Sequence, residues 1–388
     1  MDVITQKVIN ESIRGFGNDQ AKIPCQVQYR PKDAKYDEKI REFQGCPTVA
    51  VSRGGRVFLG WYSGGTCEPH MENYNYLTYS DDGGKTFGDP LLVIQSEKER
   101  GVHALDIQLW TAPNGALWVF WVQNNAMPLT HENDYMLWAR QTNTRPVVDS
   151  NGYLFPDMRH TEWCVVCEDP DAKDPVFSPP RLLDIGFLRC KPLVTQSGRW
   201  IFFNYDQLTD TYGYSISDDE GKTFTRHYGP SKMPTSFDET MAYQTKSGRI
   251  RMLARNNQGF LAECTSRDEG MSWSDTKLNT IPSPDTRFYI GRTPSGRIIL
   301  VNNAMSEKRQ CMSVWLSDDD GTTFPHRKVV DDPAYLLSYP DVDFYGDTIY
   351  LTYDHERTGA KEIRLLTFTE EDVISPATSL RSAIVSKP

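Results

Sequence analysis

A short turn motif recurs four times along the chain, and this repetition constrains the fold more than any other sequence feature. Each copy follows the pattern S-x-D-x-G-x-[ST]-[FW], and the copies begin at Ser80, Ser217, Ser266 and Ser317. In such a turn the Ser and Asp side chains can bond backbone amides, the Gly supplies a positive φ, and the aromatic residue can pack between neighbouring sheets. Four copies of one constrained turn predict repeated structural units.

A second repeat is a hairpin that has a glycine in its turn and apolar arms. The hairpin glycines are Gly55, Gly115, Gly198, Gly248, Gly296 and Gly346. Their separations are 60, 83, 50, 48 and 50 residues, and each precedes a strand-like run such as TIYLTYD. Six units of this kind predict an all-β fold, a six-bladed β-propeller of four-stranded antiparallel blades. The longest separation indicates an insertion around residues 124–174.

Composition favours one large β domain over several helical ones. The chain has 388 residues, of which Phe, Trp and Tyr make up 12%, a share that suits half-buried strands. We expect residues 43–388 to form a single propeller domain. Residues 1–42, with a short helix over 6–13, are expected to pack on the propeller or to close it.

Charge and hydropathy exclude several classes of partner. The net charge is −10 and no stretch is basic enough to bind phosphates, which excludes nucleic acid. No apolar run approaches the roughly 18 residues of a spanning helix, and residues 1–18 lack the apolar core of a signal peptide. The sequence as written therefore predicts a cytoplasmic location, or secretion if a leader was trimmed.

The cysteine pattern predicts neither a disulfide framework nor a metal site. Eight cysteines are scattered over the chain, which predicts reduced thiols. Cys164 and Cys167 form a lone C-x-x-C with no second ligand pair at zinc spacing, so a pair of strand residues is the better interpretation. We expect no metal and no cofactor.

Polar residues recur at one depth of the predicted blades. The residues nine positions before the first five hairpin glycines, and the equivalent residue of the shorter sixth hairpin, are Cys46, Asp106, Arg189, Glu239, Arg287 and Tyr339. Seven positions after the fourth glycine stands Arg255. Carboxylates, guanidiniums and a phenol that converge on a propeller axis predict a site for a polar, anionic small molecule such as a sugar acid. Salt bridges with only a structural role are the alternative for any single residue.

The four turns resemble the Asp boxes of sialidases (neuraminidases), which are six-bladed propellers, and the resemblance extends from about Gln44 to Asp372. Three further segments match the family pattern. Glu239 precedes a hairpin that Arg255 closes, Arg309 lies eight residues before a box serine, and Tyr339 lies in the segment Ser-Tyr-Pro-Asp-Val.

This resemblance implies an exo-acting glycoside hydrolase that removes a terminal sialic acid or related acidic sugar from a glycan, with retention through a tyrosyl intermediate. It implies Tyr339 as nucleophile, Glu239 as the base that takes its proton, and Arg255 and Arg309 as ligands of the sugar carboxylate. Tyrosine suits this role because a carboxylate nucleophile would be repelled by the carboxylate on the anomeric carbon.

The chain departs from the family pattern at two positions. The family has an arginine just before a hydrophobic residue and Pro in its first blade, whereas this chain reads Phe-Gln-Gly-Cys-Pro at 43–47, and Arg189 or Arg287 are candidate replacements. No aspartate matches the family's acid/base. Glu68 is our candidate acid and Glu72 its alternate. Asp106 is expected to contact the sugar.

Two other functions are compatible with the same scaffold. One is a glycosidase for rhamnose or a uronic acid that uses His70, His103 or Glu239. The other is a noncatalytic propeller that binds a glycan or a protein. The pairing of Tyr339 with Glu239 favours an enzyme, because a binding site needs no base beside its phenol.

Overall fold

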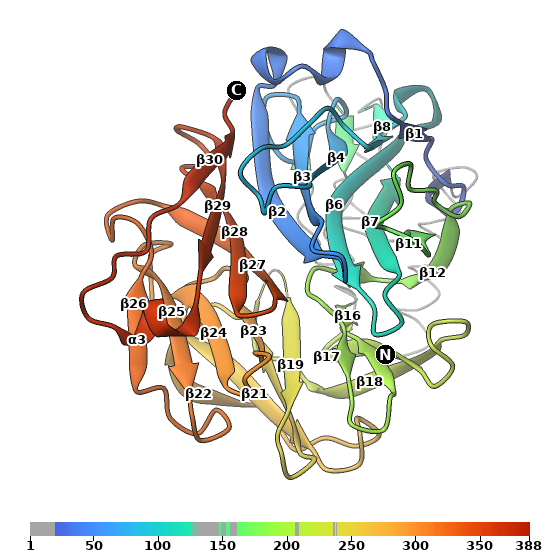
Figure 1. Ribbon diagram of the computed structural model, residues 1–388. Coiled ribbons are helices and arrows are strands. Elements are labelled where there is room, and N and C mark those ends of the chain that lie inside the picture. The colour runs from blue at the N-terminus through green and yellow to red at the C-terminus, as the bar shows by residue number, and fades with distance from the viewer. Residues whose placement is uncertain are drawn as a thin grey trace.

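The computed structural model describes residues 20–125, 161–205, 209–235, 237 and 239–388, and the backbone of three short strands between 126 and 160. The predicted helix over 6–13 and most of the predicted insertion lie outside the described residues. Six antiparallel sheets are arranged in a ring around one axis (Figure 1). The predicted all-β, six-bladed propeller is confirmed.

The strands of each blade follow the order of the chain from the axis outward, and other strands intervene in blades 2 and 3. Blades 1 and 2 contain β2 (Phe43–Val51), β3 (Val57–Gly64), β4 (Tyr74–Ser80) and β5 (Leu92–Gln95), then β6 (Val102–Thr111), β7 (Leu117–Asn125), β11 (Thr161–Cys167) and β12 (Arg181–Ile185). Blade 3 contains β14 (Leu193–Val194), β15 (Trp200–Phe202), β17 (Thr211–Ser217) and β18 (Thr225–Ser231). β13 (Phe187–Leu188) lies before the hairpin of β14 and β15, β16 (Asn204–Tyr205) lies after it, and β13 and β16 pair with each other.

The last three blades have the same order. They contain β19 (Thr240–Gln244), β20 (Ile250–Ala254), β21 (Phe260–Ser266) and β22 (Lys277–Pro282); β23 (Tyr289–Arg292), β24 (Ile298–Asn303), β25 (Met312–Ser317) and β26 (His326–Val329); and β27 (Leu337–Tyr345), β28 (Thr348–His355), β29 (Glu362–Phe368) and β30 (Ala383–Ser386). The helix α3 (Glu370–Ile374) precedes β30. A separate small sheet consists of β8 (Met127–Pro128), β9 (Val147–Val148) and β10 (Tyr153–Phe155).

Blade 1 has a fifth strand that the repeat pattern does not predict. β1 (Val27–Tyr29) pairs with β5 on the outer edge of this blade. Just before it, the 3₁₀ turn η1 (Gln20–Lys22) packs on β7 of blade 2, where the Gln123 side chain donates to the carbonyl of Ala21 at 3.0 Å. Three further 3₁₀ turns are η2 (Ala34–Tyr36), η3 (Glu38–Ile40) and η4 (Lys98–Arg100). The described part of the N-terminal segment thus packs on blades 1 and 2.

The four repeated turns share one hydrogen-bond pattern. In the second copy Ser217 Oγ accepts from the Gly221 amide at 2.8 Å, and Asp219 Oδ1 accepts from the Thr223 amide at 2.8 Å. Hydrogen bonds from the Thr223 hydroxyl and the Thr223 amide to this carboxylate lower the pKa of Asp219 to about 2. Gly221 has φ +79°, which a residue with a Cβ rarely adopts. Side-chain bonds therefore set the shape of each turn, as the motif predicts.

The strand directions place these turns and the predicted site at opposite edges of the ring. The hairpin glycines join the first two strands of each blade at one edge, and the repeated turns join the third and fourth strands at that same edge. Residues that begin an inner strand or end the next strand lie at the other edge, because successive strands are antiparallel. Glu239 and Arg255 lie at this other edge.

Polar contacts around the axis hold the first and last blades together. Asp341 Oδ2 on β27 accepts from Thr48 Oγ1 at 2.7 Å and from the Val49 amide at 3.0 Å, both on β2. It also lies 3.4 Å from Lys191 Nζ. Buried charges need such partners, and here the partners come from blades 1 and 3.

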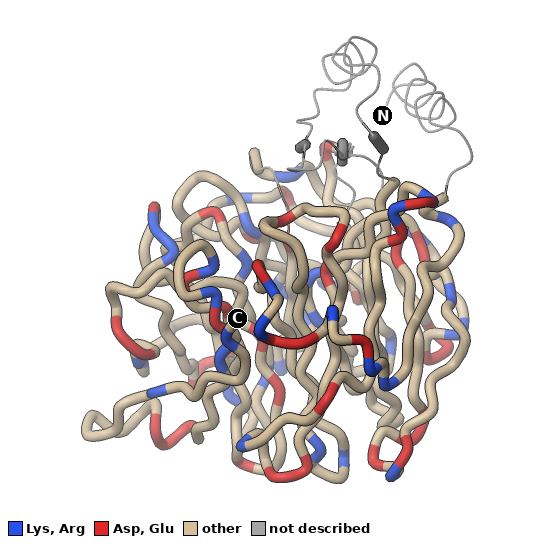
Figure 2. The backbone as a smooth tube through the Cα atoms, turned by 90° about the horizontal axis from the view of Figure 1, so that it is seen from above, with Lys and Arg blue, Asp and Glu red and all other residues tan. Residues whose placement is uncertain are grey.

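The charged residues of the described chain are of mixed sign, and its described helices are short. Basic and acidic residues are interspersed along the described chain (Figure 2). Among the described helices, none has the length and apolar character needed to cross a membrane. All eight cysteines are free thiols, and Cys164 and Cys167 are buried on β11.

Candidate active site

Three inner strands carry the same local distortion at the predicted depth. Cys46, Asp106 and Tyr339 have φ of 53°, 59° and 55°, and the pairing of each strand with its neighbour shifts at this point. A positive φ is strained for residues other than glycine and is typical of functional sites. Bulges in β2, β6 and β27 thus give these three side chains equivalent settings near the axis.

Arginines surround the ring of Tyr339, which is only 8% exposed. Arg255 Nη1 donates to its Oη at 3.3 Å. The distances from guanidinium carbon to ring centroid are 4.4 Å for Arg357, 5.2 Å for Arg189, 5.5 Å for Arg287 and 5.6 Å for Arg309. The structure therefore brings the phenol together with all four predicted arginines, Arg189, Arg255, Arg287 and Arg309, and with Arg357, which was not predicted.

Glu239 shares a hydrogen-bond donor, Arg255 Nη1, with this phenol. Its Oε2 lies 2.9 Å from Arg255 Nη1, the atom that also bonds Tyr339, and its Oε1 lies 3.7 Å from Arg189 Nε. Burial acts to raise the pKa of Glu239, but Arg255 and Arg189 outweigh it and hold the pKa below its usual value. Glu239 is therefore ionised and can accept a proton.

The phenol itself is protonated over the physiological range. Burial and the Glu239 charge raise the pKa of Tyr339 to about 12, and Arg255 opposes this rise. A phenol with this pKa attacks only if a base removes its proton during the reaction.

Asp106 and Arg189 form a buried ion pair beside these groups. Asp106 Oδ1 lies 2.9 Å from Arg189 Nη1, and both side chains are at most 5% exposed. Burial raises the pKa of Asp106 to about 7 even though Arg189 acts to lower it, and the charges of Glu68 and Glu239 add to the rise. The predicted sugar-contact residue thus changes charge near neutral pH.

The other two predicted arginines have different settings. Arg287 is fully buried and its guanidinium donates to four backbone carbonyls, among them those of Arg189 at 2.7 Å and Pro340 at 2.9 Å. Arg309 is partly exposed and donates to the carbonyl of Asp285 at 3.0 Å. The Arg287 guanidinium is therefore bound to backbone carbonyls of the scaffold, whereas Arg309 is partly open to solvent.

The candidate acids, Glu68 and Glu72, and the candidate histidines, His70 and His103, have different neighbours in the structure. Glu68, in the loop between β3 and β4, lies 3.8 Å from Cys46 Sγ, whereas the Glu72 side chain is exposed. His70 Nδ1 lies 3.1 Å from the Glu72 amide, and His103 Nε2 lies 3.0 Å from the Tyr62 hydroxyl. The structure therefore brings Glu68 to the central cluster.

Comparison with known proteins identifies the scaffold. A family model described as a BNR repeat-like domain matches residues 154–351, which is just over half of the chain. The chain belongs to the BNR repeat-like family. No curated protein matches it.

Solved structures similar to this BNR propeller include sialidases. The Hadza microbial sialidase Hz136 is 15% identical over 87% of this chain and 67% of its own, with a TM-score of 0.65. The leech intramolecular trans-sialidase is 13% identical over 90% of this chain and 71% of its own, with a TM-score of 0.66. A Dyadobacter fermentans protein of unknown function is 16% identical over 93% of this chain and 99% of its own, with a TM-score of 0.61. The likeness shows a sialidase-like fold.

Arg357 is the site residue of this BNR propeller that sequence reasoning missed. It lies in the turn between β28 and β29, and its Nη1 and Nη2 lie 2.8 Å from Glu68 Oε2 and 2.6 Å from Asp354 Oδ2. Offsets counted from hairpin glycines find strand residues but not residues of longer turns. The available signal was Gly45, because a glycine in place of the family's arginine leaves room for another side chain.

One group of side chains has the donor types of a metal site. Ligand atoms of Cys46, Glu68 and Asp106 lie within 4.8 Å of one another. Guanidiniums already pair with both carboxylates of this group, since Arg357 Nη1 lies 2.8 Å from Glu68 Oε2 and Arg189 Nη1 lies 2.9 Å from Asp106 Oδ1. The donor set fits a cation poorly, and the absence of a metal requirement stays a prediction.

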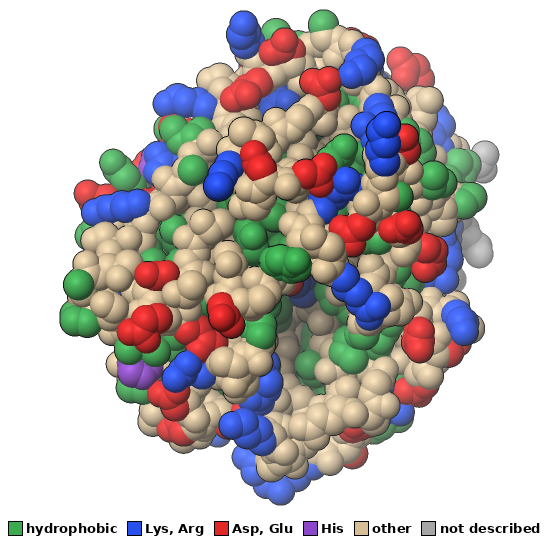
Figure 3. All heavy atoms as spheres, viewed as in Figure 1, with side chains coloured by type: hydrophobic (Ala, Val, Ile, Leu, Met, Phe, Trp, Pro, Cys, Tyr) green, Lys and Arg blue, Asp and Glu red, His purple; other side chains and the backbone are tan. Residues whose placement is uncertain are grey.

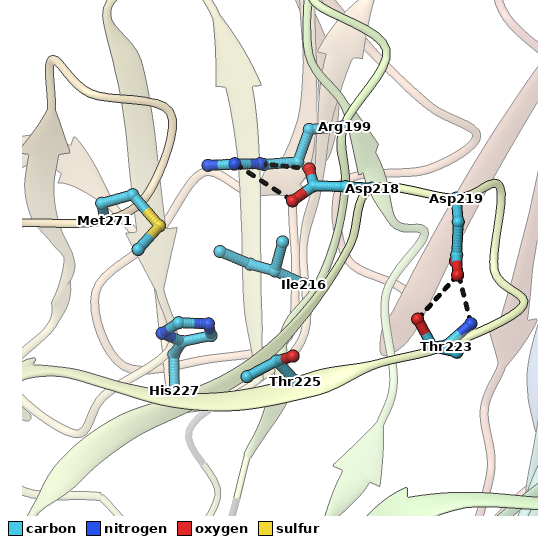
Figure 4. Close-up of a pocket in the computed structure, with 8 residues that line it drawn as sticks. All are labelled: Arg199, Ile216, Asp218, Asp219, Thr223, Thr225, His227 and Met271. Carbon is cyan, nitrogen blue, oxygen red and sulfur yellow. Dashed lines mark hydrogen bonds and ion pairs between the residues drawn. The ribbon is translucent and has the colours of Figure 1, made fainter.

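Two hollows lie on the described surface of the molecule. The face seen in Figure 3 is hollowed where the blades converge, and Lys and Arg side chains border the hollow. A hollow between blade 3 and the repeated turn of blade 4 is lined by Arg199, Asp218, His227 and Met271, and there Arg199 Nε pairs with Asp218 Oδ1 at 2.7 Å (Figure 4). This second hollow includes Asp219 and Thr223 of a repeated turn, so it lies at the edge opposite the candidate site.

Proposed function

We propose that this protein is an exo-acting glycosidase of sialidase type, which removes a terminal sialic acid or a related acidic sugar from a glycan with retention of configuration. The observation that carries the proposal is the shared donor, Arg255 Nη1, which lies 2.9 Å from Glu239 Oε2 and 3.3 Å from Tyr339 Oη. Residues 43–388 form the catalytic domain in this proposal.

Tyr339 is the proposed nucleophile. Its Oη attacks the anomeric carbon and its proton passes to Glu239, so that a covalent tyrosyl sugar forms while the glycosidic bond breaks. A neutral phenol suits a carbon that bears a carboxylate, because an Asp or Glu nucleophile would meet like-charge repulsion. The raised pKa of Tyr339 keeps the phenol protonated at rest and the lowered pKa of Glu239 keeps the carboxylate ionised, which are the starting states that these roles need.

Glu68 is the proposed acid and base for the leaving group. It gives a proton to the departing glycan oxygen, and in the second half it takes a proton from the water that attacks the anomeric carbon. Tyr339 then regains its proton from Glu239. The position of Glu68 beside Cys46 in the central cluster supports this choice over Glu72, whose side chain is exposed.

The proposed substrate is acidic because of the arginines. Arg255 and Arg309 both contact Tyr339, so a carboxylate on the carbon that Tyr339 attacks lies within their reach. Asp106, in the neighbouring bulge, is proposed to contact the ring substituents of the sugar.

A substrate panel tests the proposal. The purified protein is assayed with aryl glycosides of sialic acid, its deaminated analogue, rhamnose and uronic acids. We expect release of the aryl group from a sialic acid glycoside, with the axial or equatorial configuration retained in the first product seen by NMR. Turnover of rhamnosides alone would assign a different sugar, and no turnover of any glycoside would indicate a noncatalytic propeller.

A further inference from the structure

Arg357 holds two carboxylates that differ in how firmly they are fixed. Asp354, three residues earlier in the chain, has a side chain that is 1% exposed. Its Oδ2 lies 2.6 Å from Arg357 Nη2 and 3.1 Å from Nε, and it accepts from the Cys46 amide at 3.0 Å. Its other oxygen accepts from the Ser338 hydroxyl. Asp354 is therefore a permanent partner that orients the guanidinium.

Glu68 is the loosely held partner. Its side chain is 23% exposed and comes from the loop between β3 and β4. Its carboxylate reaches Arg357 through a single atom, Nη1, at 2.8 Å. Both side chains are mostly buried, with 17% of Arg357 and 23% of Glu68 exposed, so loss of this contact is costly unless another carboxylate takes the place of Glu68 on the guanidinium.

Gly45 makes room for this arrangement. A Cβ at position 45 would lie 2.9 Å from Arg357 Nε and 3.3 Å from Cζ, closer than side chains pack. A glycine here in β2 therefore allows a guanidinium from blade 6 to lie against blade 1. It also places positive charge beside Tyr339, 4.4 Å from the ring centroid.

Resting on the proposed function, we infer that Arg357 receives the carboxylate of the acidic sugar and that Glu68 occupies this subsite until the sugar displaces it. One carboxylate exchanges for another on Nη1, and no covalent bond changes. A neutral sugar cannot make this exchange, because it would leave a guanidinium without its second anion. The Glu68–Arg357 contact thus selects for acidic sugars.

Ligand affinity measured by calorimetry tests this inference without any need for turnover. The probe is the 2,3-didehydro form of sialic acid, which has no leaving group for Glu68 to protonate, and its methyl ester is the neutral comparison. We expect Arg357→Met to weaken binding of the acid by roughly ten- to hundredfold. We expect Glu68→Gln to tighten binding of the acid by about two- to fivefold, since the competing carboxylate is gone. Binding of the ester should change in neither variant.

Two matched variants control the experiment. Arg327 lies outside the site and is stacked on Trp315 with its guanidinium carbon 4.5 Å from the ring, much as Arg357 is stacked on Tyr339. Glu72 lies in the same loop as Glu68, with an exposed side chain. Arg327→Met and Glu72→Gln should both bind the acid as the wild type does.

The possible outcomes separate the inference from the proposed function. Equal affinity of Arg357→Met and wild type for the acid would overturn the inference, and so would weaker binding of the acid by Glu68→Gln. The proposed function would still be supported if the wild type turned over a sialic acid glycoside. Failure of the wild type to bind the acid would overturn both. Where Arg357→Met does not fold, Arg357→Lys serves instead, and an affinity for the acid equal to that of wild type would also contradict the inference, because a lysine lacks the planar fork.

Discussion

At the residue scale, Asp106 gives the site a charge that depends on pH. Burial raises the pKa of this carboxyl to about 7, so it is neutral below that pH and negative above it. A negative Asp106 adds repulsion toward an anionic ligand beside Tyr339. Affinity for an acidic sugar should therefore fall as pH rises through about 7.

Asp106→Asn should remove this pH dependence, because the amide stays neutral at every pH. We expect the affinity of wild type for the didehydro acid to fall roughly three- to tenfold between pH 6 and pH 8, and the variant to keep the low-pH affinity throughout. Calorimetry over this range measures the effect. Asp347→Asn, at an exposed turn position, is the control and should retain the wild-type pH profile.

Residue positions were predictable where strands set them. The depth rule placed Glu239 and Tyr339 in one cluster from the sequence, because equivalent strands carry equivalent offsets. Arg357 escaped this rule, since its position depends on the course of a turn and on the space beside Gly45. Arg287 does lie at the predicted depth, but its guanidinium already donates to backbone carbonyls, which the depth rule does not predict.

At the element scale, the repeated turns depend on glycines whose surroundings differ. Gly321 has φ +81°, and a Cβ there would overlap the Tyr243 hydroxyl and lie 2.8 Å from its ring carbon Cζ. Gly296, in the hairpin turn of the same blade, has φ +95° and nothing within 4 Å of such a Cβ. Both positions strain an alanine backbone, but only position 321 adds a collision.

A pair of alanine variants should separate these two costs. Gly296→Ala should destabilise the protein by about 1–2 kcal/mol, the cost of a left-handed conformation with a Cβ. Gly321→Ala should cost about 1–3 kcal/mol more, because Tyr243 must also move. Urea unfolding measures both, and equal costs would show that the turn relaxes freely around the tyrosine.

The repeats predicted the order of the strands and blades, but they did not predict the bulges or the strand β1. The hairpin glycines and repeated turns predicted the blade order, since each demands a positive φ that few residues can adopt. The bulges at Cys46, Asp106 and Tyr339 have no signal common to all three, because Pro follows Cys46 and Tyr339 whereas Ile follows Asp106. The strand β1 was also missed, since three residues are too few for a periodic pattern.

At the scale of the whole molecule, Arg287 connects blades that are distant in sequence. From the start of blade 5 it donates to the carbonyls of Arg189, Pro47 and Pro340, which belong to the inner parts of blades 3, 1 and 6. It also reaches Gln108 Oε1 of blade 2 at 3.3 Å. One guanidinium thus satisfies buried acceptors from four other blades.

Arg287→Met should destabilise the entire ring, because several buried carbonyls lose their donor at once. We expect a loss of roughly 3–5 kcal/mol in the free energy of unfolding, measured by urea denaturation. Arg327→Met, on the exposed face of β26, should change stability by less than about 0.5 kcal/mol. An Arg287→Met variant as stable as wild type would show that the ring does not depend on this hub.

The global architecture was predictable from six regular spacings, but the contacts that close the ring were not. Asp341 of β27 joins Thr48 and Val49 of β2, a pairing of residues almost 300 positions apart. Such contacts carry no local pattern, because they depend on where the first and last blades meet.

The Tyr339→Phe variant tests the central claim most directly. It removes the attacking oxygen and keeps the ring that packs among the arginines, so folding and affinity for the didehydro acid should be nearly unchanged. Turnover of the sialic acid glycoside should fall by several orders of magnitude in kcat. Glu239→Gln should impair the same step, and the double variant should be hardly worse than the worse single one. Near-normal turnover by Tyr339→Phe would contradict the account and leave Glu239, Asp106 and Glu68 as candidates for hydrolysis by a carboxylate pair.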